Sequence, residues 1–172
     1  MTTSPDTGPR AATTPATRGS GPAPHRVLVT GSRTWKNHAP IHAALDELLT
    51  THPDLVLVHG ACKQGADAIA DRWARLRGLP DNRIVRHPAE WRRYKAAAGG
   101  RRNTAMVQAG AHICLAFIDL CAKPACDKPM PHGSHGAEDC ARKAHAAGIP
   151  VTPDPPWKTR HDAVQLTFGG AP

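Results

Sequence analysis

Four segments of this sequence place glycines next to hydroxyl, basic or acidic side chains, a combination suited to binding a phosphate or a carboxylate. They lie at residues 30–35 (TGSRTW), 59–67 (HGACKQGAD), 99–106 (GGRRNTAM) and 133–139 (GSHGAED). Glycine lets the backbone approach a ligand closely, and arginine supplies a forked cation. Where such a segment opens a helix, the free N–H groups of the first turn also favour an anion. The four segments together predict a site for a phosphate-bearing ligand.

The candidate ligand-binding residues come from all four segments. They are Gly31, Ser32, Arg33, Gly60, Gly65, Asp67, Arg102, Asn103, Gly133, Ser134 and Gly136. Two structural alternatives remain open: a plain turn with a surface arginine at 31–33, and a first-turn acid that stabilises its helix at Asp67. The segments do not match the dinucleotide fingerprint or the Walker A loop, which would require glycine at Arg33 and lysine at Ala66.

Apolar runs alternate with helical patterns, and these elements must position the candidate residues. Strands are predicted at 26–30, 55–58, 83–86, 112–118 and from 149. Helices are predicted from Asn37 or His38 to 49, and at 69–76, 99–110 and 137–147. The strands are too apolar to leave one face in water. The pattern therefore predicts an α/β fold: a single Rossmann-like three-layer domain with a mainly parallel sheet of about five strands. Ligands bind such sheets where strands end, which is where the glycine segments fall.

The 172 residues suffice for one ordinary domain. We expect a disordered N-terminal tail at 1–24, a nucleotide-binding domain at 25–152, and a C-terminal extension at 153–172 with a marginal edge strand at 163–168. No run approaches the roughly 20 apolar residues of a membrane span, and the N-terminus lacks an apolar signal region. The cysteine count is five, an odd number, which disfavours a disulfide framework. A cytoplasmic protein without a membrane partner is expected.

Basic residues outnumber acidic ones by 22 to 14, which gives a formal net charge of +8. Many of them lie between Arg72 and Arg102, and such a balance favours nucleotides, phosphates or nucleic acid as partners. A solvated basic face is the alternative. Aromatic residues are sparse in this stretch, so a stacking surface for single strands is weakly supported. A nucleotide or nucleotide sugar is therefore preferred to nucleic acid as partner, and a homodimer is one candidate assembly.

A cluster of potential metal ligands follows the most apolar predicted strand. It consists of Cys121, Cys126, His132, His135 and Cys140. Zinc favours tetrahedral sulfur and nitrogen ligands, so these residues could bind it. Their spacing matches no common zinc finger, and His135 lies inside a proposed phosphate loop. No metal or other cofactor is therefore assigned, and a loop with reduced cysteines is preferred to the zinc alternative.

The order of these motifs resembles the SLOG superfamily. The motifs are GSRTW, HGxxxxGAD, AEW at 89–91, RRNxxM, LAF, GSHGA and AxxAGIPV, and the match extends roughly from His25 to Val151. More narrowly, the chain resembles the YspA/cpYpsA-related branch, which is frequent in actinobacteria and their phages. The resemblance implies a Rossmann-like fold that binds nucleotides or their derivatives. Relatives include the LOG-type phosphoribohydrolases, formerly described as lysine decarboxylase-like, and DprA-like DNA-processing proteins.

The LOG enzymes imply roles for individual positions. Their ligand-facing arginine corresponds to Arg102, and the glycines of their PGGxGTxxE element to Gly133 and Gly136. Their catalytic glutamate corresponds to Cys140, and Glu138 and Asp139 are expected to point elsewhere on the helix. No catalytic residue is therefore assigned. The predicted function is nucleotide binding by a sensing or processing module, with a phosphoribohydrolase-like enzyme and a DprA-like nucleic-acid-binding protein as alternatives.

Overall fold

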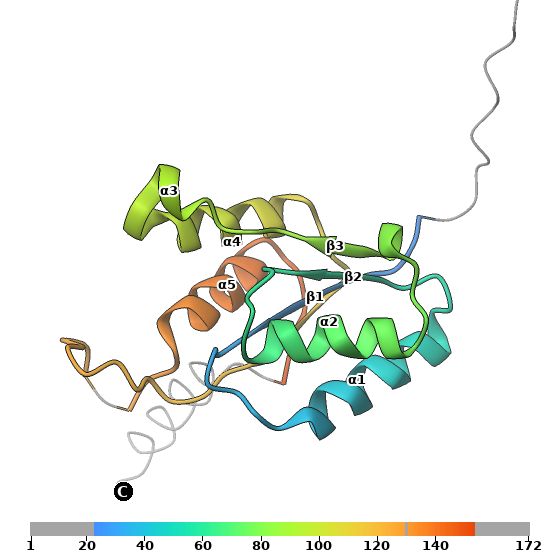
Figure 1. The fold of residues 1–172 in the computed structure, drawn as a ribbon, viewed down its shortest axis with the longest axis horizontal. Coiled ribbons are helices and arrows are strands. Elements are labelled where there is room, and N and C mark those ends of the chain that lie inside the picture. Colours follow the sequence, from blue (N-terminus) through green and yellow to red (C-terminus); the bar gives the residue numbers. More distant parts are fainter. Residues whose placement is uncertain (1–22, 130, 154–172) are drawn as a thin grey trace, which may run out of the picture.

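A five-stranded, all-parallel sheet forms the centre of the protein in a computed structural model that describes residues 23–129 and 131–153 (Figure 1). The strands are β1 (Arg26–Gly31), β2 (Val56–His59), β3 (Ile84–Arg86), β4 (Ile113–Phe117) and β5 (Val151–Thr152). Their spatial order is β3-β2-β1-β4-β5, and every pairing is parallel. The predicted Rossmann-like α/β fold is thus confirmed, and each strand lies within two residues of its predicted position.

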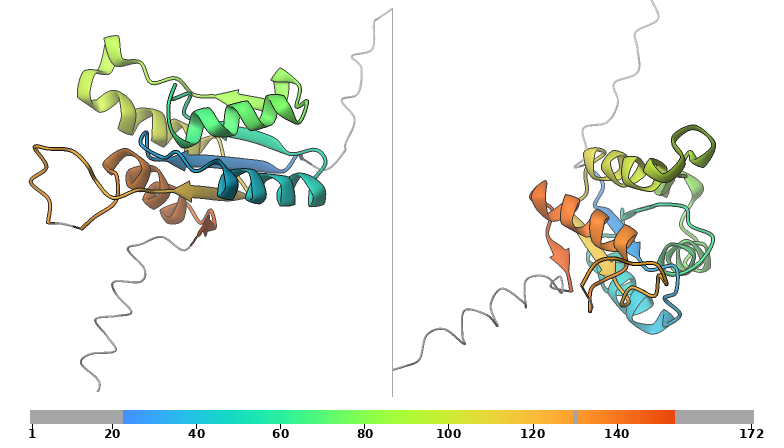
Figure 2. Two further views of the ribbon diagram at one scale, coloured as in Figure 1. Left: turned by 60° about the horizontal axis from the view of Figure 1, so that its bottom comes forward. Right: turned by 90° about the vertical axis from the view of Figure 1, so that its left-hand side faces the viewer.

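Helices cover both faces of the sheet and complete the predicted three layers (Figures 1 and 2). The helices are α1 (His38–Thr51), α2 (Ala66–Leu76), α3 (Trp91–Tyr94), α4 (Ala98–Gln108) and α5 (His135–Ala146), with short 3-10 helices η1 (Asp81–Arg83) and η2 (Lys95–Ala97). Helices α1 and α2 pack on one face, and α4 and α5 pack on the other. The pair α3 and η2 between β3 and α4 was not predicted, because a single turn carries no apolar repeat.

Two apolar clusters hold these layers together. The larger one lies between the sheet and the helices α1 and α2, and it includes the fully buried Trp73 and Leu45. The second joins the sheet to α4 and α5 through Met106, Cys140 and Ala144. The prediction that Met106 belongs to the core is therefore confirmed.

The strand order reverses between β1 and β4, and the chain is tightly packed at this point. Gly31 pairs with Phe117, and a Cβ atom at Gly31 would collide with the Ala66 side chain and the Phe117 carbonyl oxygen. The next residue donates its backbone N–H to the same carbonyl oxygen at 2.9 Å, and its buried hydroxyl, Ser32 Oγ, accepts from the Asp119 N–H at 2.8 Å. The C-terminal ends of β1 and β4 are thereby fixed relative to each other, where ligands bind in open α/β sheets.

The predicted tail and extension lie almost entirely outside the described residues, as does the predicted edge strand at 163–168. The domain boundaries therefore remain predictions. All five cysteines lie in the described part of the chain and are free. Within that part, no helix combines the length and apolar character needed to cross a bilayer.

Candidate functional site

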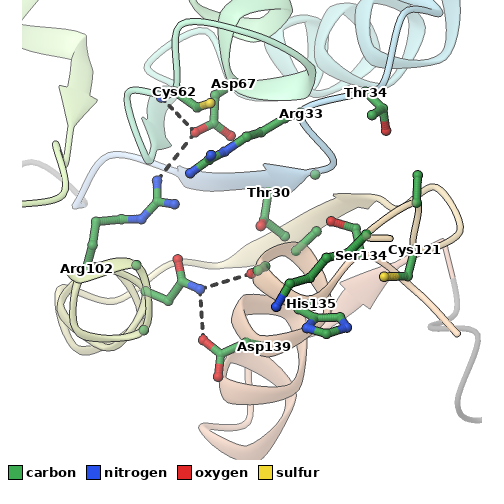
Figure 3. Close-up of a pocket in the computed structure, with 18 of the residues that line it drawn as sticks. Thr30, Arg33, Thr34, Cys62, Asp67, Arg102, Cys121, Ser134, His135 and Asp139 are labelled. Carbon is green, nitrogen blue, oxygen red and sulfur yellow. Dashed lines mark hydrogen bonds and ion pairs between the residues drawn. The ribbon is translucent and has the colours of Figure 1, made fainter. Parts of the chain in front are cut away.

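A pocket of about 760 Å³ opens at the C-terminal edge of the sheet, where β1 and β4 separate (Figure 3). The end of β1 contributes Thr30 and Gly31 to its lining. The starts of α2 and α5 contribute Asp67 and Gly136, the middle of α4 contributes Asn103, and the segments after β1 and β4 complete it. The volume lies in the range of about 300–1,000 Å³ that is usual for small-molecule sites.

Most of the predicted ligand-binding residues meet in this one pocket. Those that line it are Gly31, Arg33, Asp67, Arg102, Asn103, Ser134 and Gly136. Ser32, Gly60, Gly65 and Gly133 are not part of the lining and instead shape the wall behind it. Ser32 holds Asp119, and a Cβ atom at Gly133 would crowd Ile118 and Glu138.

Arg102 and Asp67 form a buried ion pair in one wall. Arg102 Nη1 lies 3.5 Å from Asp67 Oδ2, and the two side chains are 17% and 7% exposed. The same carboxylate oxygen accepts the backbone N–H of Cys62 at 3.1 Å. Burial raises the pKa of Asp67 from its usual value, although the N–H donor and Arg102 oppose that shift. Arg102 Nε is buried without a hydrogen-bond partner among the described residues. Asp67 is the one hydrogen-bond partner of the guanidinium in the described chain, so others of its five N–H groups remain for a ligand.

Arg33 reaches the pocket from the segment after β1, and its side chain and that of Arg102 extend towards each other (Figure 3). Its guanidinium carbon lies 5.6 Å from the ring centroid of Trp91, within the range of a cation–π contact. No hydrogen bond or ion pair joins Arg33 to another residue of the described chain. Trp91 also lines the pocket and is 49% exposed. The mouth of the pocket thus combines an arginine with a half-exposed indole.

A polar network fixes the start of α5. The side chain of the buried Asn103 donates from Nδ2 to the Gly136 carbonyl oxygen at 3.0 Å and to Asp139 Oδ2 at 2.8 Å. Lys143 Nζ donates to the same carboxylate oxygen and to the Gly100 carbonyl oxygen. These bonds tie α4 to α5 and hold the first turn of α5 at the pocket. The helix cap Ser134 makes no side-chain capping bond, so backbone N–H groups of this turn remain available to an anion.

The wall between β2 and α2 depends on an unusual backbone. Gly65 caps α2 with φ of 72° and ψ of −150°, and a Cβ atom there would collide with the Ser32 carbonyl oxygen and the Arg33 backbone. The buried His59 supports this loop, because its Nδ1 accepts the Ala61 N–H at 3.2 Å. Its Nε2 lies 3.2 Å from Asp71 Oδ1. Gly65 therefore lets α2 begin directly against the segment that carries Arg33.

Asp139, in the first turns of α5, was expected to point away from the ligand site, but it lines the pocket. Cys140, at the position of the LOG glutamate, is fully buried in the second apolar cluster, and burial raises the pKa of its thiol to about 11. Asp139 lines the pocket instead, with its carboxylate already bonded to Asn103 and Lys143. The helix thus presents position 139, and not position 140, to the cavity. Cys140 also lies outside the cluster formed by the other four candidate metal ligands.

Several lining residues were not in the predicted set: Thr30, Thr34, Trp91, Lys123 and Asp139. Thr34 is held by a 2.6 Å hydrogen bond from its Oγ1 to Asp119 Oδ2, a contact between residues far apart in sequence. Trp91 follows β3 in the AEW motif at 89–91. Its position after a predicted strand could have indicated that it lies at the ligand site. Lys123 lies in an irregular segment whose path no sequence pattern indicates.

The fold defines a Rossmann-like α/β protein, with a pocket where the strand order of the sheet reverses. Residues 25–94 match the model of the YspA, cpYpsA-related SLOG family. The chain is also similar to the Gene 61 protein of Mycobacterium phage D29, with 44% identity over 130 residues, which cover 73% of this chain and 93% of that protein. The chain belongs to the YspA, cpYpsA-related SLOG family, which associates it with nucleotide-related binding or processing.

Proposed function

We propose that the pocket binds a nucleotide or a nucleotide-derived ligand through its phosphate. The observation that carries this proposal is that the side chains of Arg33, from the segment after β1, and Arg102, from α4, extend towards each other in one pocket with the first turn of α5 (Figure 3). Only Arg102 has a carboxylate partner in the described chain, so the pair retains positive charge for an anion. A charge-assisted hydrogen bond contributes about 1.5–3 kcal/mol, or roughly ten- to hundredfold in affinity.

The indole of Trp91 supports a base or another flat group as the second part of the ligand. It is 49% exposed and lies on the rim beside Arg33. Stacking of a base on an aromatic side chain contributes about 1–3 kcal/mol. A ligand with a phosphate between the arginines and a base on Trp91 fits the size of the pocket.

We favour the role of a sensing module, which binds the nucleotide without hydrolysing it. Cleavage of an N-glycosidic bond requires stabilisation of an oxocarbenium-like sugar and assistance to the leaving base. The residue at the LOG glutamate position is a buried, protonated thiol. A nucleotide-processing enzyme is the second candidate, because the carboxylates of Asp67 and Asp139 do line the pocket.

Calorimetric titration with a panel of nucleoside mono-, di- and triphosphates and nucleotide sugars tests the proposal. We expect at least one of them to bind the wild type, and Arg33→Ala to weaken that binding at least tenfold. Arg101→Ala is the matched control, because Arg101 also packs over an aromatic ring, at 4.2 Å from the Tyr94 centroid, but lies outside the pocket. Equal losses in the two variants, or no binding by any member of the panel, would contradict the proposal.

A further inference from the structure

The segment between β4 and α5 and the first residue of α5 bring four side chains together at one end of the pocket. Cys121, Cys126, His132 and His135 each place one potential ligand atom so that all four atoms lie within 4.8 Å of one another. Cys126 Sγ lies 3.1 Å from His135 Nε2 and 3.4 Å from His132 Nε2, and the two Nε2 atoms are 3.0 Å apart. We propose that these four residues bind one zinc ion as a structural site.

The geometry is close to that of a tetrahedral Cys2His2 centre. Zinc–sulfur bonds of about 2.3 Å and zinc–nitrogen bonds of about 2.0–2.1 Å put neighbouring ligand atoms roughly 3.3–3.8 Å apart. The observed separations approach these values, so a small adjustment admits the ion. Sulfur and imidazole donors in this ratio select zinc over the hard cations magnesium and calcium. Four protein ligands leave no open position, which is typical of a structural and not a catalytic zinc.

His132 is already oriented as a metal ligand. Its ring is buried, at 8% exposure, and Nδ1 donates to the Pro129 carbonyl oxygen at 2.9 Å. A neutral imidazole protonated on Nδ1 carries a free lone pair on Nε2, and that atom points into the cluster. A second hydrogen bond of this kind is the usual way in which proteins fix the tautomer of a metal-binding histidine.

Apart from the proposed zinc site, few interactions hold the segment between β4 and α5 in its conformation. One antiparallel bridge, between Leu120 and Gly133, closes its ends. It consists of bonds from the Cys121 N–H to the His132 carbonyl oxygen at 2.8 Å and from the Ser134 N–H to the Asp119 carbonyl oxygen at 2.9 Å. Between them, residues 122–125 and 127–129 are exposed, and the segment extends beyond the sheet (Figure 2). A segment without an apolar core is stabilised when metal-binding energy becomes folding energy.

The proposed ion would lie at the wall of the pocket. Cys121 and His135 both line the cavity and are found at the same end of it (Figure 3). His135 is the first residue of α5, so its coordination would anchor the helix start next to Gly136. Zinc would thereby fix the segment after β4 against the ligand site without contacting the ligand.

Metal analysis of the full chain tests the proposal. The protein is expressed without a histidine tag in zinc-supplemented medium, purified without chelator and desalted before mass-spectrometric element analysis. We expect about one zinc per chain in the wild type, and at least a tenfold lower content in Cys121→Ser/Cys126→Ser. Cys62→Ser is the control, because Cys62 is also partly buried but lies outside the cluster, and it should retain the zinc.

Cobalt(II) keeps the proposal testable if the double variant does not fold. Addition of cobalt(II) to metal-depleted wild type should produce the intense visible absorption of a tetrahedral thiolate complex, and zinc should displace it. A zinc content near zero after reconstitution, or a cobalt spectrum without these bands, would overturn the site and leave a loop with reduced cysteines. Zinc retained by the double variant, or lost from Cys62→Ser, would also overturn it, as would iron or another metal in place of zinc.

Discussion

The guanidinium of Arg102 occupies the space that a side chain at Gly60 would fill, and it lies 3.5 Å from the Asp67 carboxylate. The missing side chain at position 60 thus lets an arginine from α4 reach an aspartate at the start of α2. The two helices belong to opposite faces of the sheet. The ion pair therefore joins both layers at the pocket and holds one of the two proposed phosphate ligands.

Removal of Arg102 should destabilise the protein through Asp67. Arg102→Ala leaves a buried carboxylate with the Cys62 N–H as its remaining hydrogen-bond donor in the described part of the chain, which should lower the free energy of unfolding by about 1–3 kcal/mol. Adding Asp67→Asn should recover part of this loss, because the second change removes the unpaired charge. Urea denaturation of the two single variants and the double variant measures the coupling. Strictly additive losses would show that the ion pair does not act as a unit.

Gly65→Ala should be more costly than Gly78→Ala. Both glycines have φ of 72°, so both changes introduce backbone strain of about 1–3 kcal/mol, and the ψ of −150° at Gly65 lies in a region essentially confined to glycine. A Cβ atom at Gly78 meets open space, whereas one at Gly65 collides with the Ser32 and Arg33 backbones. We expect Gly65→Ala to lose a further 1–3 kcal/mol, a cost of about the size usual for overpacking. Equal free energies of unfolding for the two variants would contradict the close contact.

The wild type should release no free base from nucleoside 5′-monophosphates at ordinary enzyme rates, about 1–1000 per second. Cys140→Glu should not create this activity, because its carboxyl group would be buried in the apolar cluster and would lower the free energy of unfolding by more than about 2 kcal/mol. Chromatographic detection of free base, with thermal denaturation of the variant, checks both statements. Wild-type turnover that Asp139→Asn abolishes would instead favour the nucleotide-processing enzyme.

Acidification should destabilise the protein. The pKa values of His25, His59 and His87 are all lowered from 6.5, mainly because burial disfavours the charged imidazole. For His59 this effect outweighs the neighbouring carboxylates of Asp67 and Asp71. Between the lowered pKa and 6.5 the unfolded chain binds more protons, so this stability is complete above pH 6.5 and is lost as the pH falls through the folded pKa values.

Urea denaturation in steps from pH 7.5 to pH 5 checks this dependence. His59→Gln should flatten the curve, and His145→Gln, a change on the exposed end of α5, should leave it as in the wild type. A free energy of unfolding that stays constant or rises on acidification would contradict the assignment.

The local sequence was sufficient to predict the sheet, because the apolar runs at β1, β2 and β4 are too short for helices and too uniform for a wet face. It also placed Arg33, Asp67 and Arg102 near one another, since the ends of parallel strands share one edge. It could not predict the contact between Arg102 and Gly60, which are distant in the chain. Nor did the motif alignment show that α5 turns Asp139 towards the pocket and Cys140 into the core. That orientation depends on how α5 packs against α4 through Asn103.

A thermodynamic cycle over one phosphate group tests whether Arg33 and Arg102 hold the phosphate of the proposed ligand. The affinities of the best-binding nucleotide from the panel and of its parent nucleoside are measured by calorimetry with wild type and Arg33→Ala. We expect loss of the phosphate to weaken binding to the wild type at least tenfold, and this difference to be smaller in Arg33→Ala. A nucleoside that binds the wild type as tightly as its phosphate, or a phosphate effect of unchanged size in Arg33→Ala, would contradict it.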